Sequence, residues 1–364
     1  MKRSSKSSNK IVIKIGSSLL TGGGSSLLQD NLSRIVNHIA GFINEGKSVI
    51  VVTSGAIACG LSVLGLKKKP KGLPELQAAA AAGQNILMYV YSEELAKHDL
   101  RCAQILLTRD DFNEHKRYLN ARNTINTLLD MSVIPIINEN DAVSVEEIKF
   151  GDNDTLSASV AAAVEADGLL ILTDIDGLYD SFNSKAKSLG KLIREVKKIT
   201  PEIEDCACGT DKESCVGGMS TKIEAARIAT NVGIPVILAN GLKESLKVDF
   251  SRASGDGTLF SVPSNYRLSL KKRWIAFGAA SSGKVYVDKG ARDALVMNCG
   301  SLLAPGITGV DGNFVSGDIV DIVDSEDKVF AKGKINFSFV ELNEAKGKKN
   351  KLEVVHRDNL VILG

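Results

Sequence analysis

Short apolar runs, separated by segments with helical periodicity, constrain the fold of this chain more than any other feature. The runs are dominated by Val, Ile and Leu and lie at 11–15, 48–52, 102–107, 133–137, 169–172 and 235–238. Strands without a polar face are buried on both sides, which is typical of a parallel sheet covered by helices. We therefore predict an α/β fold for the first two thirds of the chain.

The pattern of apolar runs and turn residues changes after residue 260. Short apolar runs then lie between Gly, Asp and Asn turns, at 284–288, 301–303, 319–323 and 328–332, with one helical pattern at 291–297. Such spacing predicts a small β-rich domain. We divide the chain into a disordered basic tail (1–9), an α/β domain (10–262), a linker (263–272) and a second domain (273–364).

Composition excludes several classes of function. The net charge of +2 gives no general attraction to nucleic acid or to a membrane surface, and aromatic residues are few at 5%. No apolar run approaches the ~18 residues that span a bilayer. The cysteines are sparse and irregularly spaced, which predicts reduced thiols and a cytoplasmic protein without membrane contact.

Polar residues follow several predicted strands, at the edge where open α/β sheets bind ligands. Lys14 lies near the end of the first run, two residues before Gly16, which lets the backbone approach a phosphate. A lysine at a strand end is also common on an ordinary surface. Ser54 follows the second run, where it either caps the next helix or lies beside a helix start that receives a carboxylate. Asn138 and Asp141 follow the fourth run, and Asp141 either binds an ammonium group or forms a turn.

Two polar segments open helices further along the chain. Asp152, Asn153 and Asp154 precede an apolar helical segment. Acidic residues favour a helix N-terminus by ~0.3–1 kcal/mol each, but one suffices, so the triplet indicates a functional site. The segment GGMSTK at 217–222 offers backbone donors and a lysine at a helix start, which suits a triphosphate, although it lacks the Walker A spacing. Together these segments predict a phosphotransferase.

In combination, the motifs resemble those of the glutamate kinases in the amino acid kinase family. They occur in the family's order within residues 10–262, as KIGSS at 14–18, VTSGAI at 52–57, LLTR at 106–109, YLNARN at 118–123, INENDAV at 137–143, GDNDTLSA at 151–158 and GGMSTK at 217–222. The resemblance implies a three-layer αβα sandwich with a mainly parallel sheet. It also implies phosphorylation of the γ-carboxylate of L-glutamate to L-glutamyl 5-phosphate with ATP and Mg²⁺, the first step of proline biosynthesis.

The resemblance further implies a role for each polar cluster. The catalytic residues would be Lys14 and Lys222, which flank the transferred phosphoryl group, and Asp154, which holds both lysines. The residues that bind glutamate would be Ser54, Asn138, Asp141 and Asn153, with Asp141 near the α-ammonium group. The residues that bind the nucleotide would be Thr173, Asp174, Gly217, Gly218 and Met219, together with the two lysines. Asp152 is the candidate for a residue near the metal.

The C-terminal segment resembles a PUA domain, a pseudo-barrel module found in RNA-modifying enzymes. The matching motifs are KRW at 272–274, VDKGA at 287–291, GSLL at 300–303 and GNFVSGD at 312–318. The resemblance implies RNA as a further partner, and an RNA-binding protein is one alternative function. A kinase acting on another carboxylate, such as aspartate, is the other. The family also implies a homo-oligomer, dimer or tetramer, and contact with the next enzyme of proline synthesis.

One departure from the family's pattern lies directly before the segment 217–222. Cys215 and Val216 stand there in place of Gly-Thr or Gly-Ala, and Cys206 and Cys208 lie shortly upstream. Three cysteines fall short of a closed zinc site. We interpret them as incidental thiols of a variable loop on the nucleotide side.

Overall fold

The computed structural model describes residues 9–22, 24, 27–66, 68–143, 152–183, 188–208, 218–263, 268–278, 280–298, 300–348 and 352–363. The chain forms two compact units, one from residues 1–111 and 120–266 and the other from residues 112–119 and 267–364. The division at 266 falls inside the predicted linker 263–272. The end of that linker carries the short helix α10 (Leu270–Arg273).

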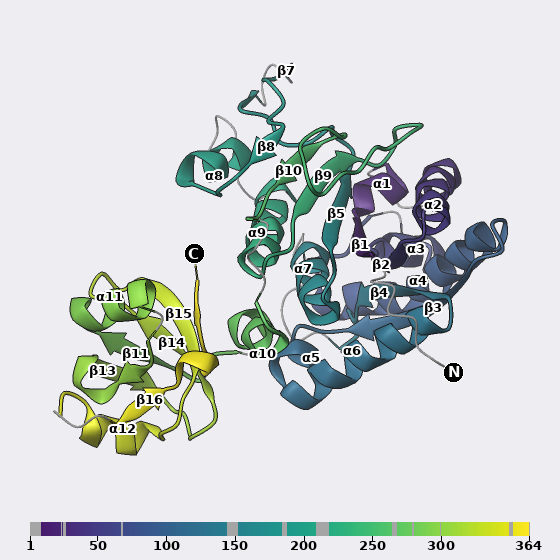
Figure 1. Ribbon diagram of the computed structural model, residues 1–364. Coiled ribbons are helices and arrows are strands. Elements are labelled where there is room, and N and C mark those ends of the chain that lie inside the picture. The colour runs from purple at the N-terminus through teal and green to yellow at the C-terminus, as the bar shows by residue number, and fades with distance from the viewer. Residues whose placement is uncertain are drawn as a thin grey trace, which may run out of the picture. The chain divides into compact units, whose positions relative to one another are not determined.

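An eight-stranded sheet forms the centre of the first unit (Figure 1), with the order β3-β4-β2-β1-β5-β9-β10-β8. Its strands are β1 (Lys10–Ile15), β2 (Ser48–Val52), β3 (Arg101–Leu107), β4 (Val133–Glu139), β5 (Gly168–Thr173), β8 (Glu195–Val196), β9 (Val236–Asn240) and β10 (Thr258–Phe260). All neighbours are parallel except β9 and β10. The mainly parallel sheet predicted from the apolar runs is therefore confirmed.

Helices connect the strands and cover both faces of the sheet. They are α1 (Ser17–Thr21), α2 (Gln29–Asn44), α3 (Ala56–Val63), α4 (Leu73–Ala96), α5 (Asp110–Asn113), α6 (His115–Asp130), α7 (Asp152–Val164), α8 (Pro201–Cys208) and α9 (Gly218–Asn231). Figure 1 shows α2, α3 and α4 on one side of the sheet and α7 and α9 on the other. This arrangement is the predicted αβα sandwich.

The two faces of β1 show how the sheet positions a functional side chain. Ile11, Ile13 and Ile15 are fully buried in the core that α2 and α4 cover. Successive side chains of a strand point to opposite faces. Val12 and Lys14 therefore lie on the face that α7 covers. The strand thus places the Lys14 ammonium group in the interior of the protein. Apart from Lys10 at its start, the other residues of β1 are all apolar.

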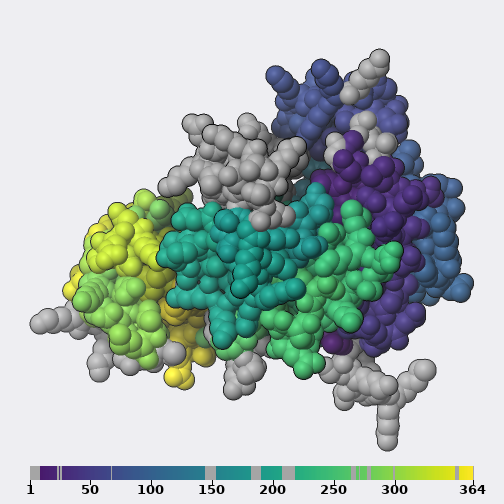
Figure 2. Space-filling model, turned by 90° about the horizontal axis from the view of Figure 1, so that it is seen from above, coloured from purple at the N-terminus to yellow at the C-terminus, as the bar shows by residue number. Residues whose placement is uncertain are grey.

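Strands from distant parts of the sequence complete the far edge of the sheet. The short β8 pairs with β10 in parallel, and Figure 2 shows the teal segment around β8 and α8 beside the green segment around β9 and β10. A small antiparallel pair, β6 (Phe182–Asn183) and β7 (Ser188–Leu189), lies between β5 and β8 in the sequence.

The second unit contains a separate five-stranded sheet with the order β13-β11-β14-β15-β17. Its strands are β11 (Gly283–Val287), β13 (Ile307–Gly312), β14 (Ile319–Val323), β15 (Val329–Lys334) and β17 (Leu360–Ile362), and a further pair is β12 (Leu302–Leu303) with β16 (Glu353–Val355). Helices α11 (Lys289–Asn298) and α12 (Phe339–Ala345) accompany them. The predicted β-rich domain with one helix near 291–297 is confirmed, and α12 is an addition.

The described helices include none that is both long enough and apolar enough to cross a membrane.

Candidate active site

The carboxyl ends of four neighbouring strands, β4, β2, β1 and β5, carry about half of the predicted site residues, and the starts of α7 and α9 carry most of the others. Asn138 lies near the end of β4, Ser54 follows β2, Lys14 lies in β1 and Thr173 ends β5. Because parallel strands end at the same edge, residues far apart in sequence meet there. The sequence predicted this edge as the ligand site, and the structure brings the residues to it.

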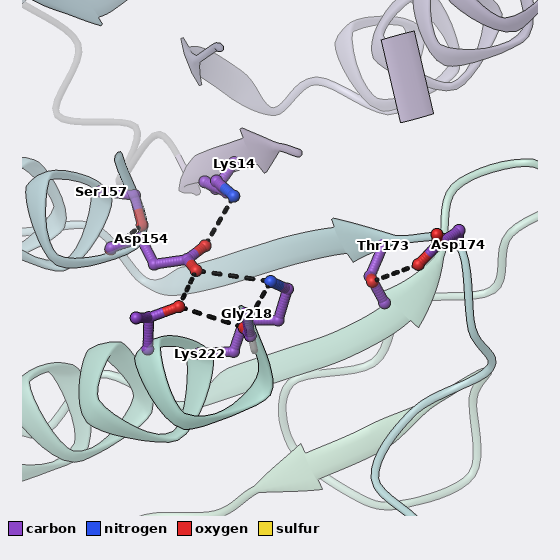
Figure 3. Close-up of polar contacts among 8 residues, drawn as sticks. Lys14, Asp154, Ser157, Thr173, Asp174, Gly218 and Lys222 are labelled. Carbon is purple, nitrogen blue, oxygen red and sulfur yellow. Dashed lines mark hydrogen bonds and ion pairs between the residues drawn. The ribbon is translucent and has the colours of Figure 1, made fainter. Parts of the chain in front are cut away.

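Lys14, Asp154 and Lys222 form one charged group, in which Lys14 and Asp154 are buried and Lys222 is partly buried (Figure 3). Lys14 Nζ lies 2.6 Å from Asp154 Oδ1, and Lys222 Nζ lies 3.4 Å from Asp154 Oδ2. Lys14 is 4% exposed and Asp154 is fully buried. Three separate elements supply them, β1, the first turn of α7 and the first turns of α9. The Asp154 carboxylate therefore bridges two ammonium groups.

The charges of this group depend on one another. Burial alone raises the pKa of the Asp154 carboxyl, but the charges of Lys14 and Lys222, together with the hydrogen bonds from Lys14 and Thr221, outweigh burial and hold that pKa below its usual value. Burial lowers the pKa of the Lys14 ammonium group, and Asp154 opposes this shift. Asp154 is thus an anion near neutral pH, and its charge is what favours the protonated form of Lys14.

Two hydroxyl groups that the sequence did not single out hold Asp154 in place. Thr221 Oγ1 donates to Asp154 Oδ2 at 2.6 Å, and Ser157 Oγ donates to the Asp154 backbone oxygen at 2.6 Å. Lys222 Nζ also donates to the Gly218 carbonyl at 2.6 Å, one turn back along α9. Thr221 directly precedes Lys222 in the GGMSTK motif. That position beside a predicted catalytic lysine is the feature of the sequence from which Thr221 could have been identified as a site residue.

The predicted nucleotide residues lie at the end of β5 and at the start of α9. Thr173 is buried at the end of β5, and its hydroxyl donates to Asp174 Oδ1 at 3.1 Å. Asp174 itself is exposed. Gly218 and Met219 open α9, so their backbone N–H groups belong to the unpaired first turn of a helix. Gly217 lies outside the described residues.

The predicted glutamate residues Asn138 and Asn153 meet at one backbone group. The N–H of Glu139 lies 3.0 Å from Asn138 Oδ1 and 3.1 Å from Asn153 Oδ1. Asn138 Nδ2 donates to Gln84 Oε1 at 2.8 Å. The end of β4, the start of α7 and the middle of α4 are thereby linked. Gln84 was not predicted from the sequence.

Asp141 lines a hollow beside these residues. The lining residues are Ala56, Ala80, Ala81, Gln84, Leu106, Glu139, Asn140, Asp141 and Ala142, around an empty volume of about 210 Å³. Glu139 and Asp141 give the lining an acidic character, which suits a cationic group.

Ser54 does not cap α3, which corrects one of its two interpretations. Gly55 is the N-cap residue, with φ at 102°, and no side chain caps this helix. A positive φ of this kind favours glycine. Ser54 is half-buried and lies just before α3, two residues before Ala56, which lines the hollow.

Helices α3 and α4 pack with their backbones in contact along one wall of the hollow. A Cβ atom on Gly83 would overlap the backbone of Ala56 and Gly60, and one on Gly60 would overlap that of Ala79. Ala56 lines the hollow. The small residues therefore fix the spacing of the two helices that form this wall.

No group of three His, Cys, Asp or Glu side chains within the described ranges is arranged to hold a metal ion. Mg²⁺ in phosphotransferases is held by one or two carboxylates together with phosphate oxygens and water. The exposed carboxylate of Asp174, which accepts a hydrogen bond from Thr173 at the end of β5, is a side chain of this kind at the ligand edge of the sheet. Asp152 is the first residue of α7.

The thiols show no sign of a metal site among the described residues. Cys206 is free, and its thiol donates to the Glu202 carbonyl at 3.1 Å. Burial raises the pKa of this thiol. Cys208 ends α8, and Cys215 lies outside the described residues.

Comparison with known proteins covers both units. The sequence profile of the amino acid kinase family matches residues 9–240, and that of the PUA domain matches residues 283–356. A glutamate 5-kinase of Moorella thermoacetica is 44% identical, over 98% of this chain and 96% of that protein. The glutamate 5-kinase of Thermoanaerobacter sp. strain X514 is 42% identical, and that of Caldanaerobacter subterraneus subsp. tengcongensis is 43% identical, each over 97% of this chain and 98% of the relative.

Proposed function

The chain belongs to the amino acid kinase family, and we propose that it transfers the γ-phosphoryl group of ATP to the γ-carboxylate of L-glutamate. The product is L-glutamyl 5-phosphate, the first intermediate of proline biosynthesis. The observation that carries the proposal is the charged group of Lys14, Asp154 and Lys222 at the ligand edge of the sheet. Relatives named glutamate 5-kinase, which match nearly the whole chain, support the choice of substrate.

The acceptor needs no general base. A glutamate side chain has a reference pKa of ~4.3, so its carboxylate is ionised at neutral pH. One carboxylate oxygen forms a bond to the γ-phosphorus, the bond from that phosphorus to the β–γ bridging oxygen breaks, and ADP leaves with the electron pair. The difficulty is to bring two anions together, so catalysis rests on positioning and on electrostatic stabilisation.

We assign that stabilisation to the two lysines. Lys14 and Lys222 lie on either side of one carboxylate, and their ammonium groups would contact the transferred phosphoryl oxygens. Asp154 is a positioning residue, because it acts through both lysines and its own oxygens are occupied by them and by Thr221. With all three residues ionised, the group keeps one net positive charge for the anionic reactants.

We assign the glutamate site to Ser54, Asn138, Asp141 and Asn153. Asp141 would pair with the α-ammonium group, which the acidic lining of the hollow supports. The amide groups of Asn138 and Asn153, which meet at one backbone N–H, would fix the wall of the site.

We assign the nucleotide site to Thr173, Asp174, Gly217, Gly218 and Met219, with the two lysines at its inner end. Mg²⁺ bound to the phosphates would neutralise part of their charge. Asp152, at the start of α7, is the proposed residue near this ion.

The direct test is Mg·ATP turnover with L-glutamate, with the acyl phosphate trapped by hydroxylamine. L-Aspartate and N-acetyl-L-glutamate serve as competing acceptors. Hydroxamate from glutamate alone supports the proposal. Hydroxamate from aspartate alone would show the same chemistry on another substrate, and none from a folded, ATP-binding protein would refute the proposal.

The lysine assignment has its own test. Lys14→Ala and Lys222→Ala should each lower kcat by at least about 100-fold, the scale of a lost charge-stabilising group. Lys47→Ala is the control, because Lys47 pairs with Glu45 before β2, at the opposite edge of the sheet. Near-normal turnover in both site variants would remove the lysines from the mechanism.

RNA as a partner, the homo-oligomer and contact with the next enzyme of proline synthesis stay predictions. RNA binding by the full chain that weakens steeply with salt would support the first.

A further inference from the structure

Gln84 is a buried polar residue in the wall of the hollow. It lies near the middle of α4, is 9% exposed and lines the same hollow as Asp141. Its neighbours in the helix wall are alanines, so it is the only amide that α4 contributes to the lining of this hollow. A polar side chain at such a position calls for partners for both ends of its amide group.

The hydrogen-bond network fixes how the Gln84 amide is turned. The backbone N–H of Glu139 lies 3.0 Å from one end of the Asn138 amide, which must therefore be its oxygen. The Asn138 nitrogen is then the end that faces Gln84, at 2.8 Å. It follows that Gln84 presents its oxygen to Asn138 and turns its nitrogen away.

The nitrogen of Gln84 has no hydrogen-bond partner among the described residues, although it is buried. Buried donors without an acceptor are uncommon in folded proteins. A binding site built around a ligand acceptor leaves such a donor, because the missing bond is made by the ligand.

We propose that Gln84 Nε2 donates a hydrogen bond to the α-carboxylate of the bound amino acid. The proposal rests on the proposed function. Asp141, assigned to the α-ammonium group, lines the same hollow as Gln84, and the α-carboxylate is attached to the same carbon. The hollow also contains Ala56, the first residue of α3, and a helix start favours an anion. Gln84 therefore helps the enzyme to select substrates with a free α-carboxylate.

The test is Gln84→Glu, compared with wild type on L-glutamate and on its α-amide, isoglutamine. The substitution keeps an oxygen that accepts from Asn138 and replaces the donor by a carboxylate. Repulsion should raise the KM for glutamate by about 10- to 100-fold, the range for a hydrogen bond to a charged group. The α-amide carries an NH₂ donor that the introduced carboxylate accepts. The preference in kcat/KM for glutamate over isoglutamine should therefore fall by at least about 10-fold.

The matched control is Asn85→Leu, which alters the next residue of α4, an exposed one. It should keep the wild-type preference and the wild-type KM for ATP. A merely structural role for Gln84 would weaken both acceptors alike, so an unchanged preference in Gln84→Glu would overturn the inference. Should that variant fail to fold, Gln84→Met removes the donor at equal length and should lose part of the same preference.

The outcomes separate the two proposals. Wild-type enzyme that makes no hydroxamate from glutamate refutes the proposed function itself. Wild-type turnover of glutamate with an unaltered preference in both Gln84 variants leaves that function in place and removes only the role of Gln84.

Discussion

Asp154→Asn should expose how strongly this site depends on one buried charge. The substitution leaves Lys14, at 4% exposure, without its counter-ion. Removal of one partner of a buried ion pair costs roughly 3–5 kcal/mol of the free energy of unfolding. The Lys47–Glu45 pair has the same 2.6 Å separation, but the Glu45 side chain is 62% exposed. Glu45→Gln should cost only about 0.2–1 kcal/mol, as is usual for surface pairs.

The cost of Asp154→Asn should shrink as the pH rises. Burial lowers the pKa of Lys14 in the folded protein, and Asp154 opposes that shift. Without Asp154 the folded pKa falls further below the unfolded value of ~10.4. A folded protein that binds fewer protons than the unfolded chain gains up to ~1.4 kcal/mol of stability per pH unit. In Asp154→Asn this gain begins at a lower pH than in wild type. The difference in the free energy of unfolding between the variant and wild type therefore becomes smaller between about pH 7 and pH 10.

Equilibrium urea denaturation followed by circular dichroism, at several pH values, measures both effects. The wild type, Asp154→Asn and Glu45→Gln are compared at each pH. Turnover of the Asp154 variant at neutral pH should also fall by at least about 100-fold, because both lysines lose their position. The electrostatic reasoning would be refuted if Asp154→Asn lost no more free energy of unfolding at neutral pH than Glu45→Gln does. It would also be refuted if the loss in Asp154→Asn were the same at every pH.

Two further predictions concern the supports of the site. Gly83→Ala should lower the free energy of unfolding by about 1–3 kcal/mol and raise the KM for glutamate, because the added Cβ overlaps the backbone of Ala56 and pushes α3 away. Gly41→Ala, also within a helix but with open space around the added Cβ, should instead stabilise by about 0.5–1 kcal/mol; equal thermal shifts in the two variants would contradict this account. Thr221→Val should lower kcat by about 10-fold through the lost hydrogen bond to Asp154, while Thr221→Ser keeps the donor and stays near wild type; steady-state kinetics that show both variants alike would remove the hydroxyl from the site.

The parallel sheet was predictable because its central strands are buried on both faces and consist mainly of apolar residues. The edge strand β3 is only partly buried, but most of its residues are apolar as well. The runs 48–52 and 319–323 coincide with β2 and β14, and most others differ only at their ends. Helix α4 was not anticipated. Its apolar residues do not form a single stripe along one side of the helix, which is the pattern that identifies an amphipathic helix. Many of its residues are alanines, which pack closely against neighbouring elements on several sides.

The charged centre of the site was predictable, but its supports were not. Lys14, Asp154 and Lys222 lie in motifs whose residue types already indicate phosphate chemistry. The role of Gln84 depends on which end of an amide faces Asn138, and only the hydrogen-bond network shows that. Glutamine in a helix is ordinarily a solvent-exposed residue. The tight contact at Gly83 is likewise a property of two helices together, which no local pattern contains.

The order of the strands explains why the residues proposed for glutamate and for the nucleotide lie on the two sides of β1, the strand that carries Lys14. In the sheet, β2 and β4 lie on one side of β1. The chain then passes through α7, and the next strand, β5, lies on the other side of β1. This reversal beside β1 is a topological switch point, where strand ends diverge and ligands bind. Residues assigned to glutamate follow β2 and β4, and Thr173, assigned to the nucleotide, ends β5. Helix α7, which makes the crossing, carries Asp154 in its first turn, so the connection between the two proposed sites also supplies the carboxylate that pairs with both lysines.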